Sequence, residues 1–206
     1  MLQKDAVQPA TLELLKKIMG IPDLKAFNLA GGTALALQLG HRLSLDLDFF
    51  GNVNFNPDEI LNVLSEIASP VILSQSKSIL ILNIQNIKVD FVNYRYPLLN
   101  PPYGVEGIRL LTYPDIAAMK LAAIAGRGKK RDFIDLYFSL QQYSLKELTQ
   151  FYTKKYHDGS EFIVVKSLMY FDDAEKDENP IMLKKIDWIS IKDHIGQIVT
   201  NYLKNM

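Results

Sequence analysis

Apolar residues recur along the chain with two different periods. In the first half, short segments alternate polar and apolar residues, which is typical of strands, whereas from residue 114 onward the apolar residues recur every three or four positions, as in helices. The pattern predicts strands at 26–30, 44–50, 70–75, 78–85 and 87–94. It predicts helices at 9–19, 33–39, 57–68, 114–126, 131–142, 145–156, 160–171 and 191–204, with a Pro-rich loop at 97–104 and an acidic loop at 172–180.

This order of elements indicates the fold class. Strands mixed with few helices, followed by helices alone, predict an α+β (α/β) protein in which a mixed β-sheet core with flanking helices precedes a C-terminal helical subdomain. We place the sheet-containing core at residues 1–108 and the helical subdomain at 109–206.

Composition narrows the functional classes. Lys and Arg together number 23, as do Asp and Glu, so attraction of the whole molecule to nucleic acid is not implied. The absence of cysteine excludes disulfides and thiolate zinc sites, and the three histidines show no metal-ligand spacing. The start lacks the apolar region of a signal peptide, and no run of 18 apolar residues occurs, so we expect no membrane segment and a cytoplasmic location.

Three carboxylates interrupt apolar strands. Asp46 and Asp48 fall on one face of the strand at 44–50, while Leu45, Leu47 and Phe49 alternate with them and are expected to face the core. Asp90 interrupts the strand at 87–94 in the same way. Solvent exposure of such carboxylates is the ordinary interpretation, and a divalent cation bound between them is the alternative.

Two adjacent glycines strengthen the alternative. Gly31 and Gly32 join a strand to a helix that opens at Thr33, and the free N–H groups of such a turn attract phosphate. A plain turn with Thr33 as cap remains open. Arg42 follows the helix and is expected either to touch phosphate or to balance the aspartates.

The order of these motifs resembles the nucleotidyltransferase signature of the DNA polymerase β superfamily. Gly32-Thr33 is followed after twelve residues by Asp46-x-Asp48 and later by Asp90. Within that superfamily, the segments LAGGTALALQLGHRLSLDLDFF, KVD and LTYPDIAAMKLAAIAGRGKKRDFIDLYF resemble the AbiEii/AbiGii-type nucleotidyl transferase toxin family. The resemblance covers residues 27–140 clearly and the helical tail more loosely.

The resemblance implies a role for each matching residue. It implies a nucleotidyltransferase-like fold in which Asp46, Asp48 and Asp90 hold Mg²⁺ or Mn²⁺, and in which the helical subdomain completes the active-site cleft. Lys120 is implied as a catalytic contact to the phosphates of an NTP substrate. The remaining implied nucleotide-binding residues are Gly31, Gly32, Thr33, Lys88, Arg127, Asp132 and Asp135.

The helical half has its own charged residues. Lys120 is the only charge in the apolar run at 116–126, so we expect it to reach a polar pocket, with a snorkelling lysine as the alternative. Asp132, Asp135 and Ser139 share a face opposite the buried one, where an Arg131–Asp135 surface ion pair is the ordinary interpretation. The basic cluster at 127–131 fits phosphate or RNA binding, or a helix end. The tyrosines at 94, 96 and 103 could stack a base or simply pack.

Three functions fit these observations. The first is a metal-dependent transfer of NMP from NTP to a hydroxyl of RNA, tRNA or protein, as the toxin of a toxin–antitoxin or abortive-infection system with a winged-helix antitoxin as partner. The second is the same chemistry on a small molecule such as an antibiotic. The third is a non-catalytic nucleotide-binding module, against which the three carboxylates and Lys120 argue.

Overall fold

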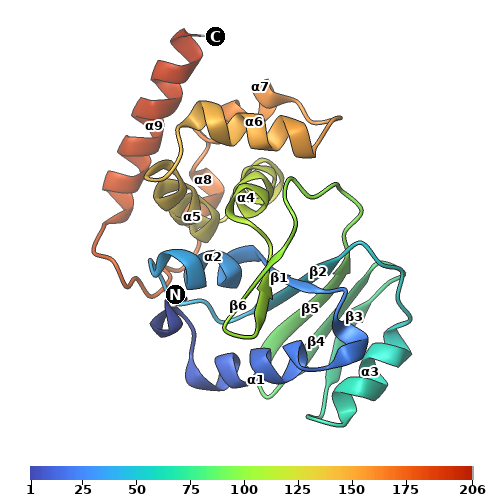
Figure 1. Cartoon of the computed structure of the whole chain (residues 1–206). Helices are drawn as coiled ribbons and strands as arrows, with labels where there is room; N and C mark the ends of the chain where they lie inside the picture. The colour runs from blue at the N-terminus through green and yellow to red at the C-terminus, as the bar shows by residue number, and fades with distance from the viewer. Residues whose placement is uncertain (206) are drawn as a thin grey trace. The chain divides into compact units, whose positions relative to one another are not determined.

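The computed structural model describes residues 1–205, which form two compact units. Unit 1 comprises Met1–Pro97 and Pro101–Thr112, and unit 2 comprises Leu98–Asn100 and Tyr113–Met206. All the strands of the described chain belong to unit 1, whereas unit 2 is helical (Figure 1).

A seven-stranded mixed sheet forms the centre of unit 1. Its strands lie in the order β3-β4-β5-β2-β1-β7-β6. The β2–β5 and β1–β7 pairs are parallel and the other neighbours are antiparallel. The bounds are β1 (Asn28–Ala30), β2 (Leu47–Gly51), β3 (Val71–Gln75), β4 (Ile79–Ile84), β5 (Ile87–Asn93), β6 (Tyr103–Val105) and β7 (Ile108–Leu110). The predicted mixed α/β fold class is confirmed.

Short helices flank the sheet. They are η1 (Lys4–Ala6), α1 (Pro9–Met19), η2 (Pro22–Leu24), α2 (Gly31–Leu39) and α3 (Pro57–Ser65). α2 packs on β1 and β2, and α1 packs on β7. The predicted ends of α1 are confirmed, since Pro9 occupies the first turn, where its missing N–H costs nothing, and Gly20 follows the last residue. α3 ends three residues before its predicted end, at Ser65.

Alternation along β2 and β5 builds the core of unit 1. Leu47 and Phe49 of β2 and Val89 and Phe91 of β5 are at most 1% exposed. The residues between them are half-buried on the other face of the sheet, as their period of two requires. Leu45 was expected to join this core, but it is 52% exposed because β2 begins only at Leu47.

The turns explain one correct prediction and one error. Gln85 and Asn86 have φ angles of 56° and 64°, which is the two-residue turn that joins β4 tightly to β5, as predicted. The β6–β7 hairpin was missed, and part of β6 lies in the segment predicted as a Pro-rich loop. Glu106 and Gly107 form its turn with φ angles of 52° and 81°. Three-residue strands next to prolines carry too little periodicity to be recognised.

Unit 2 is a group of packed helices. They are α4 (Tyr113–Arg127), α5 (Lys130–Leu140), α6 (Leu145–Lys155), α7 (Glu161–Ser167), α8 (Asp172–Glu175) and α9 (Trp188–Lys204). α4 packs against α5, α6 and α7, while α9 packs against α5 and α6. The predicted helices are present, although α7 is shorter than expected. The segment predicted as an acidic loop begins with the short helix α8.

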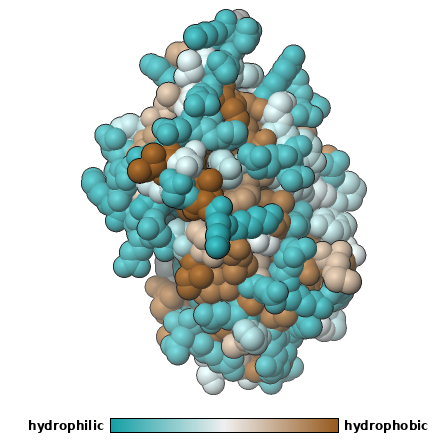
Figure 2. Space-filling view, turned by 90° about the vertical axis from the view of Figure 1, so that its left-hand side faces the viewer, coloured by the Kyte–Doolittle hydropathy of each residue, from teal (hydrophilic) through white to brown (hydrophobic). Residues whose placement is uncertain are grey.

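Some apolar side chains also reach the surface. Figure 2 shows brown patches between teal hydrophilic side chains on one face. Within residues 1–205, no helix combines the length and the apolar character needed to span a bilayer.

Candidate functional site

The site in unit 1 begins with the turn between β1 and α2. Gly31 has a φ of +65°, which L side chains rarely adopt, and a Cβ there would lie only 2.1 Å from Oδ2 of Asp48. A Cβ at Gly32 would lie 2.5 Å from Nη2 of Arg42. The two glycines therefore leave the space in which a carboxylate and a guanidinium lie against the N-terminus of α2.

Asp48 and Asp90 are neighbours across the sheet. They are paired in register on the parallel strands β2 and β5, so their side chains project from the same face of the sheet. Asp48 is also paired with Ala30, the last residue of β1, on its other side. The sequence could predict that each aspartate interrupts an apolar strand, but only the strand order brings the two carboxylates together.

Asp46 lies one residue before β2 and is held there by its backbone. Its carbonyl oxygen accepts a hydrogen bond from the hydroxyl of Thr33, which also lies 2.8 Å from the hydroxyl of Ser44. Thr33 is only 1% exposed. Its hydroxyl thus fixes the segment that leads into the acidic strand, rather than facing an open site.

Lys88 is a cation that contacts Asp90. Its ammonium donates to Oδ2 of Asp90, two residues further along β5. The other oxygen, Oδ1 of Asp90, is buried and has no hydrogen-bond partner among the described residues. A buried carboxylate oxygen without a partner is costly, which marks this position as one suited to a proton or a cation.

The carboxylates can be tested for their fit to a metal ion. Within residues 1–205, no three His, Cys, Asp or Glu side chains converge closely enough to hold one by themselves. Mg²⁺, however, is usually bound by one or two carboxylates together with substrate phosphates and water. The in-register pair of Asp48 and Asp90, with the unpartnered Oδ1, fits that mode of binding.

A second charged cluster lies in unit 2. The ammonium of Lys120 lies 3.0 Å from Oδ1 of Asp132 and 2.6 Å from Oδ2 of Asp135. Arg127 adds two hydrogen bonds to Asp132, of 2.9 Å from Nε and 3.1 Å from Nη2. All four of these residues were predicted to bind nucleotide, and the structure brings them together as two cations and two carboxylates.

Burial distinguishes this cluster from a surface network. Asp132 and Asp135 are fully buried and Lys120 is 5% exposed. Burial alone would raise the pKa of Asp132, but the charge of Lys120 and the hydrogen bonds and charge of Arg127 outweigh it, so the pKa lies below its usual value. The expectation that Asp135 lies in a surface pair was wrong, because α4 covers that face of α5 and supplies Lys120.

The basic cluster at 127–131 is partly engaged inside unit 2. Lys130 is 6% exposed, its ammonium donates to the carbonyl of Asp177 at 2.5 Å, and it lies 5.6 Å from the centre of the Trp188 ring. Arg127 is bonded to Asp132 but keeps 49% of its side chain exposed. The cluster is therefore not a continuous open basic patch.

One buried ion pair was missed by sequence reasoning. Lys155 and Asp115 lie 2.7 Å apart with both side chains fully buried, and burial lowers the pKa of Lys155 although Asp115 partly offsets this. The carboxylate of Asp115 also accepts hydrogen bonds from the backbone N–H groups of Leu99 and Asn100. This network anchors the segment Leu98–Asn100 in unit 2. The sequence showed Asp115 as a charge directly before the apolar run of α4, but it could not show that Lys155, 40 residues further along the chain, is its partner.

The aromatic residues near β5 pack on one another. Tyr94 lies 5.1 Å from Phe50 and 5.4 Å from Tyr96, measured between ring centres. Phe50 shares the face of β2 that carries Asp48, because the two residues are two positions apart. Tyr96 is 50% exposed, so this row ends in an accessible ring.

Comparison with known proteins assigns the chain to a family. The model of the nucleotidyl transferase AbiEii toxin, a type IV TA system, matches residues 13–202. An uncharacterized protein of Aquifex aeolicus (strain VF5) is 39% identical over 201 residues, which cover 94% of this chain and 96% of the relative.

Two solved structures share the fold. MenT4, the nucleotidyltransferase toxin Rv2826c from Mycobacterium tuberculosis H37Rv, has a TM-score of 0.65 at 17% identity, and the match covers 93% of this chain and 82% of MenT4. JHP933 from Helicobacter pylori has a TM-score of 0.58 at 19% identity, covering 97% and 94% of the two chains. At such low identity these likenesses concern the fold alone.

Proposed function

Because the chain belongs to the AbiEii nucleotidyl transferase toxin family, we propose that it transfers an NMP group from an NTP to a hydroxyl of RNA, tRNA or protein. Nucleotidyl transfer is the chemistry of this family, and the chain is a nucleotidyltransferase. The acceptor, the metal and the toxin role are our proposals. The observation that carries the transfer chemistry and the metal is the in-register pair of Asp48 and Asp90 beside the Gly31 turn.

We assign the triphosphate to the N-terminus of α2. The first N–H groups of a helix have no partner within it and carry a partial positive charge, so they bind phosphate oxygens. The glycines there allow close approach of a ligand, and Arg42 lies against the second of them. Lys88 is a further cation within reach of the same strand face.

Asp48 and Asp90 are the pair that would hold Mg²⁺ or Mn²⁺ together with the triphosphate, and we propose Asp46, one residue before β2, as a further ligand. A divalent cation bound there supplies positive charge to the phosphates and stabilises the charge that develops during transfer. In the reaction, the acceptor oxygen forms a bond to the α-phosphorus while the bond to the β-phosphate oxygen breaks, and pyrophosphate leaves. We assign acceptance of the hydroxyl proton to Asp90, because a carboxylate on this strand face beside the phosphates can act as a general base.

The cellular role follows from the family. We propose that the chain acts in the cytoplasm as the toxin of a type IV toxin–antitoxin pair, and that a winged-helix antitoxin encoded beside it counteracts it. Expression of the chain alone should then arrest growth, and Asp48→Asn should relieve the arrest. Growth that continues despite abundant folded protein would contradict the toxin role without contradicting the chemistry.

The chemistry is tested directly with α-phosphate-labelled NTPs, Mg²⁺ and separate pools of tRNA, other RNA and protein. Labelling of one pool by the wild type identifies the acceptor. Asp48→Asn and Asp90→Asn should reduce the rate by at least about a thousandfold, while Glu66→Gln, an exposed carboxylate at the end of α3, should keep the wild-type rate. Full activity of both aspartate variants would refute the assignment of the site.

A further inference from the structure

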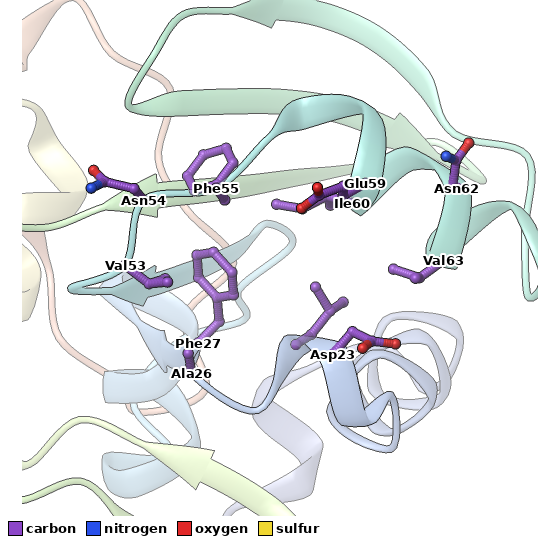
Figure 3. Close-up of a pocket in the computed structure, with 11 residues that line it drawn as sticks. Asp23, Ala26, Phe27, Val53, Asn54, Phe55, Glu59, Ile60, Asn62 and Val63 are labelled. Atoms are coloured by element: carbon purple, nitrogen blue, oxygen red, sulfur yellow. The ribbon is translucent and has the colours of Figure 1, made fainter.

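Unit 1 contains a cavity away from the three aspartates. It has a volume of about 450 Å³, within the range of small-molecule sites. Its walls come from η2, the segment before β1, the loop after β2, and α3 (Figure 3). Asp48 lies near the start of β2, and the cavity begins at Val53, beyond the end of that strand. Five residues separate the two positions, which corresponds to roughly 16 Å in an extended chain.

The interior of this cavity is apolar and aromatic. The rings of Phe27 and Phe55 lie one above the other along one wall, with centres 5.6 Å apart and planes inclined at 66°. Leu24 and Ile60 are 2% and 3% exposed and complete the floor. Such a lining favours a ligand with an apolar body of one or two rings or branched chains.

Two of the walls are fixed by contacts outside the cavity. The guanidinium of Arg109 donates to the carbonyl oxygens of Met19, Leu24 and Phe27, at 2.8, 3.2 and 3.3 Å. Phe27 also packs edge-on against Phe91 of the core, with ring centres 5.2 Å apart. The cavity is thus held open by the fold, so that a ligand need not order these walls on binding.

The charges that line the cavity are all negative. Asp23 of η2 and Glu59 of α3 come from different walls, and neither side chain has a hydrogen bond or an ion pair within residues 1–205. The other polar lining residues are the amides Asn54 and Asn62. Without a lysine, arginine or histidine in this lining, a phosphate or a nucleotide would find no opposite charge and would be repelled by both carboxylates.

We propose that this cavity binds a small organic cation, an amine with an aromatic or branched apolar body. The carboxylates of Asp23 and Glu59 attract its charge, the apolar floor takes its body, and the half-buried ring of Phe55 adds cation–π attraction. A small molecule suits a pocket of this volume, whereas a protein partner needs roughly 800 Å² of surface on each side. The proposal does not depend on the nucleotidyl transfer reaction.

The test uses three probes that share one ring and chain but differ in charge: 2-phenylethylamine, 2-phenylethanol and phenylacetate. Each is titrated at millimolar concentration into the full chain labelled with ¹⁵N, and amide resonances are followed. The amine should shift the amides of Leu24, Phe27 and Ile60. It should bind about two- to fivefold more tightly than the alcohol, because an exposed carboxylate adds only modestly to affinity, and the acid should bind least.

Matched variants separate the cavity from the general surface charge. Asp23→Asn and Glu59→Gln should each weaken amine binding about two- to fivefold and leave alcohol binding unchanged. Glu66→Gln, which removes an exposed carboxylate of unit 1 outside the cavity, should leave both unchanged. Equal affinities for the three probes, or equal losses in Glu66→Gln and Glu59→Gln, would overturn the proposal. One further result would overturn the proposal. If the chain sediments as a dimer and the amides of α3 do not respond to the amine, a second copy of the chain occupies the cavity.

Discussion

Replacing Lys120 by methionine tests whether its main role is to neutralise buried carboxylates. Lys120→Met keeps the length and apolar stem of the side chain but removes the ammonium that lies 3.0 and 2.6 Å from Asp132 and Asp135. Both carboxylates are fully buried, so the loss of the ammonium leaves their negative charge less compensated. Breaking a buried pair from one side costs about 3–5 kcal/mol. Because Arg127 still contacts Asp132, we expect the lower end, about 3 kcal/mol.

The assay can report on unit 2 alone. The chain has a single tryptophan, Trp188 of α9, whose ring lies 6.1 Å from Phe133 of α5 and 5.9 Å from Phe171. Urea unfolding followed by its fluorescence should show the loss of stability as a lower midpoint with an unchanged slope. Lys154→Met, an exposed lysine of α6, is the matched control and should change the free energy of unfolding by less than about 0.5 kcal/mol.

A double variant provides the refuting result. Lys120→Met/Asp135→Asn removes one of the two buried carboxylate charges together with the ammonium. Part of the lost stability should therefore return, with a coupling energy of about 1–3 kcal/mol between the two positions. Two results would show that the ammonium does not neutralise these carboxylates. Either Lys120→Met lowers the free energy of unfolding by less than about 1 kcal/mol, or the loss in the double variant equals the sum of the losses in the two single variants. The charge of Lys120 would then be available for a substrate.

Three further changes have defined outcomes. Gly31→Ala should abolish nucleotide transfer in a labelled-NTP assay, because Gly31 has a positive φ and an added Cβ would collide with the Asp48 carboxylate. Gly126→Ala should retain the activity, because a Cβ there meets nothing within 4 Å. The stabilising charge of Asp132, whose folded pKa is lowered, should be present above pH ~4 and lost as pH falls below it. The difference in urea midpoint between wild type and Asp132→Asn should therefore shrink on acidification. Lys88→Met should bind Mn²⁺ about two- to fivefold more tightly in calorimetry without nucleotide, because it removes the competing cation.

Local sequence predicted much of the secondary structure, because period and turn chemistry act over a few residues. The alternation of Val89, Asp90 and Phe91 sufficed for β5, and Gln85-Asn86 marked the hairpin before it. The order of the strands was not predictable, since it depends on which apolar faces meet after folding. For that reason the adjacency of Asp48 and Asp90 became visible only in the sheet.

Pairing between distant charges was also hidden from the sequence. Lys120 was recognised as an unusual charge in an apolar helix, but the face of α5 that neutralises it was interpreted as solvent-exposed. Asp115 and Lys155 were not recognised at all, because each looks like an ordinary charge at a helix end. Periodicity predicts that a residue will be buried, but it carries no information about which partner balances its charge.

The same sequence feature, a charge inside an apolar segment, therefore has two physical outcomes in this chain. In unit 2 it produces closed ion pairs, in which both oxygens of Asp132 accept hydrogen bonds from cations. In unit 1, Asp90 has one oxygen on Lys88 and another that is buried without a partner among the described residues. Closed pairs satisfy their own charges and need no ligand, whereas an unsatisfied buried oxygen costs free energy until a proton or a cation reaches it. This difference is why we assign the chemistry to the aspartates of the sheet and expect the cluster around Lys120 chiefly to hold unit 2 together.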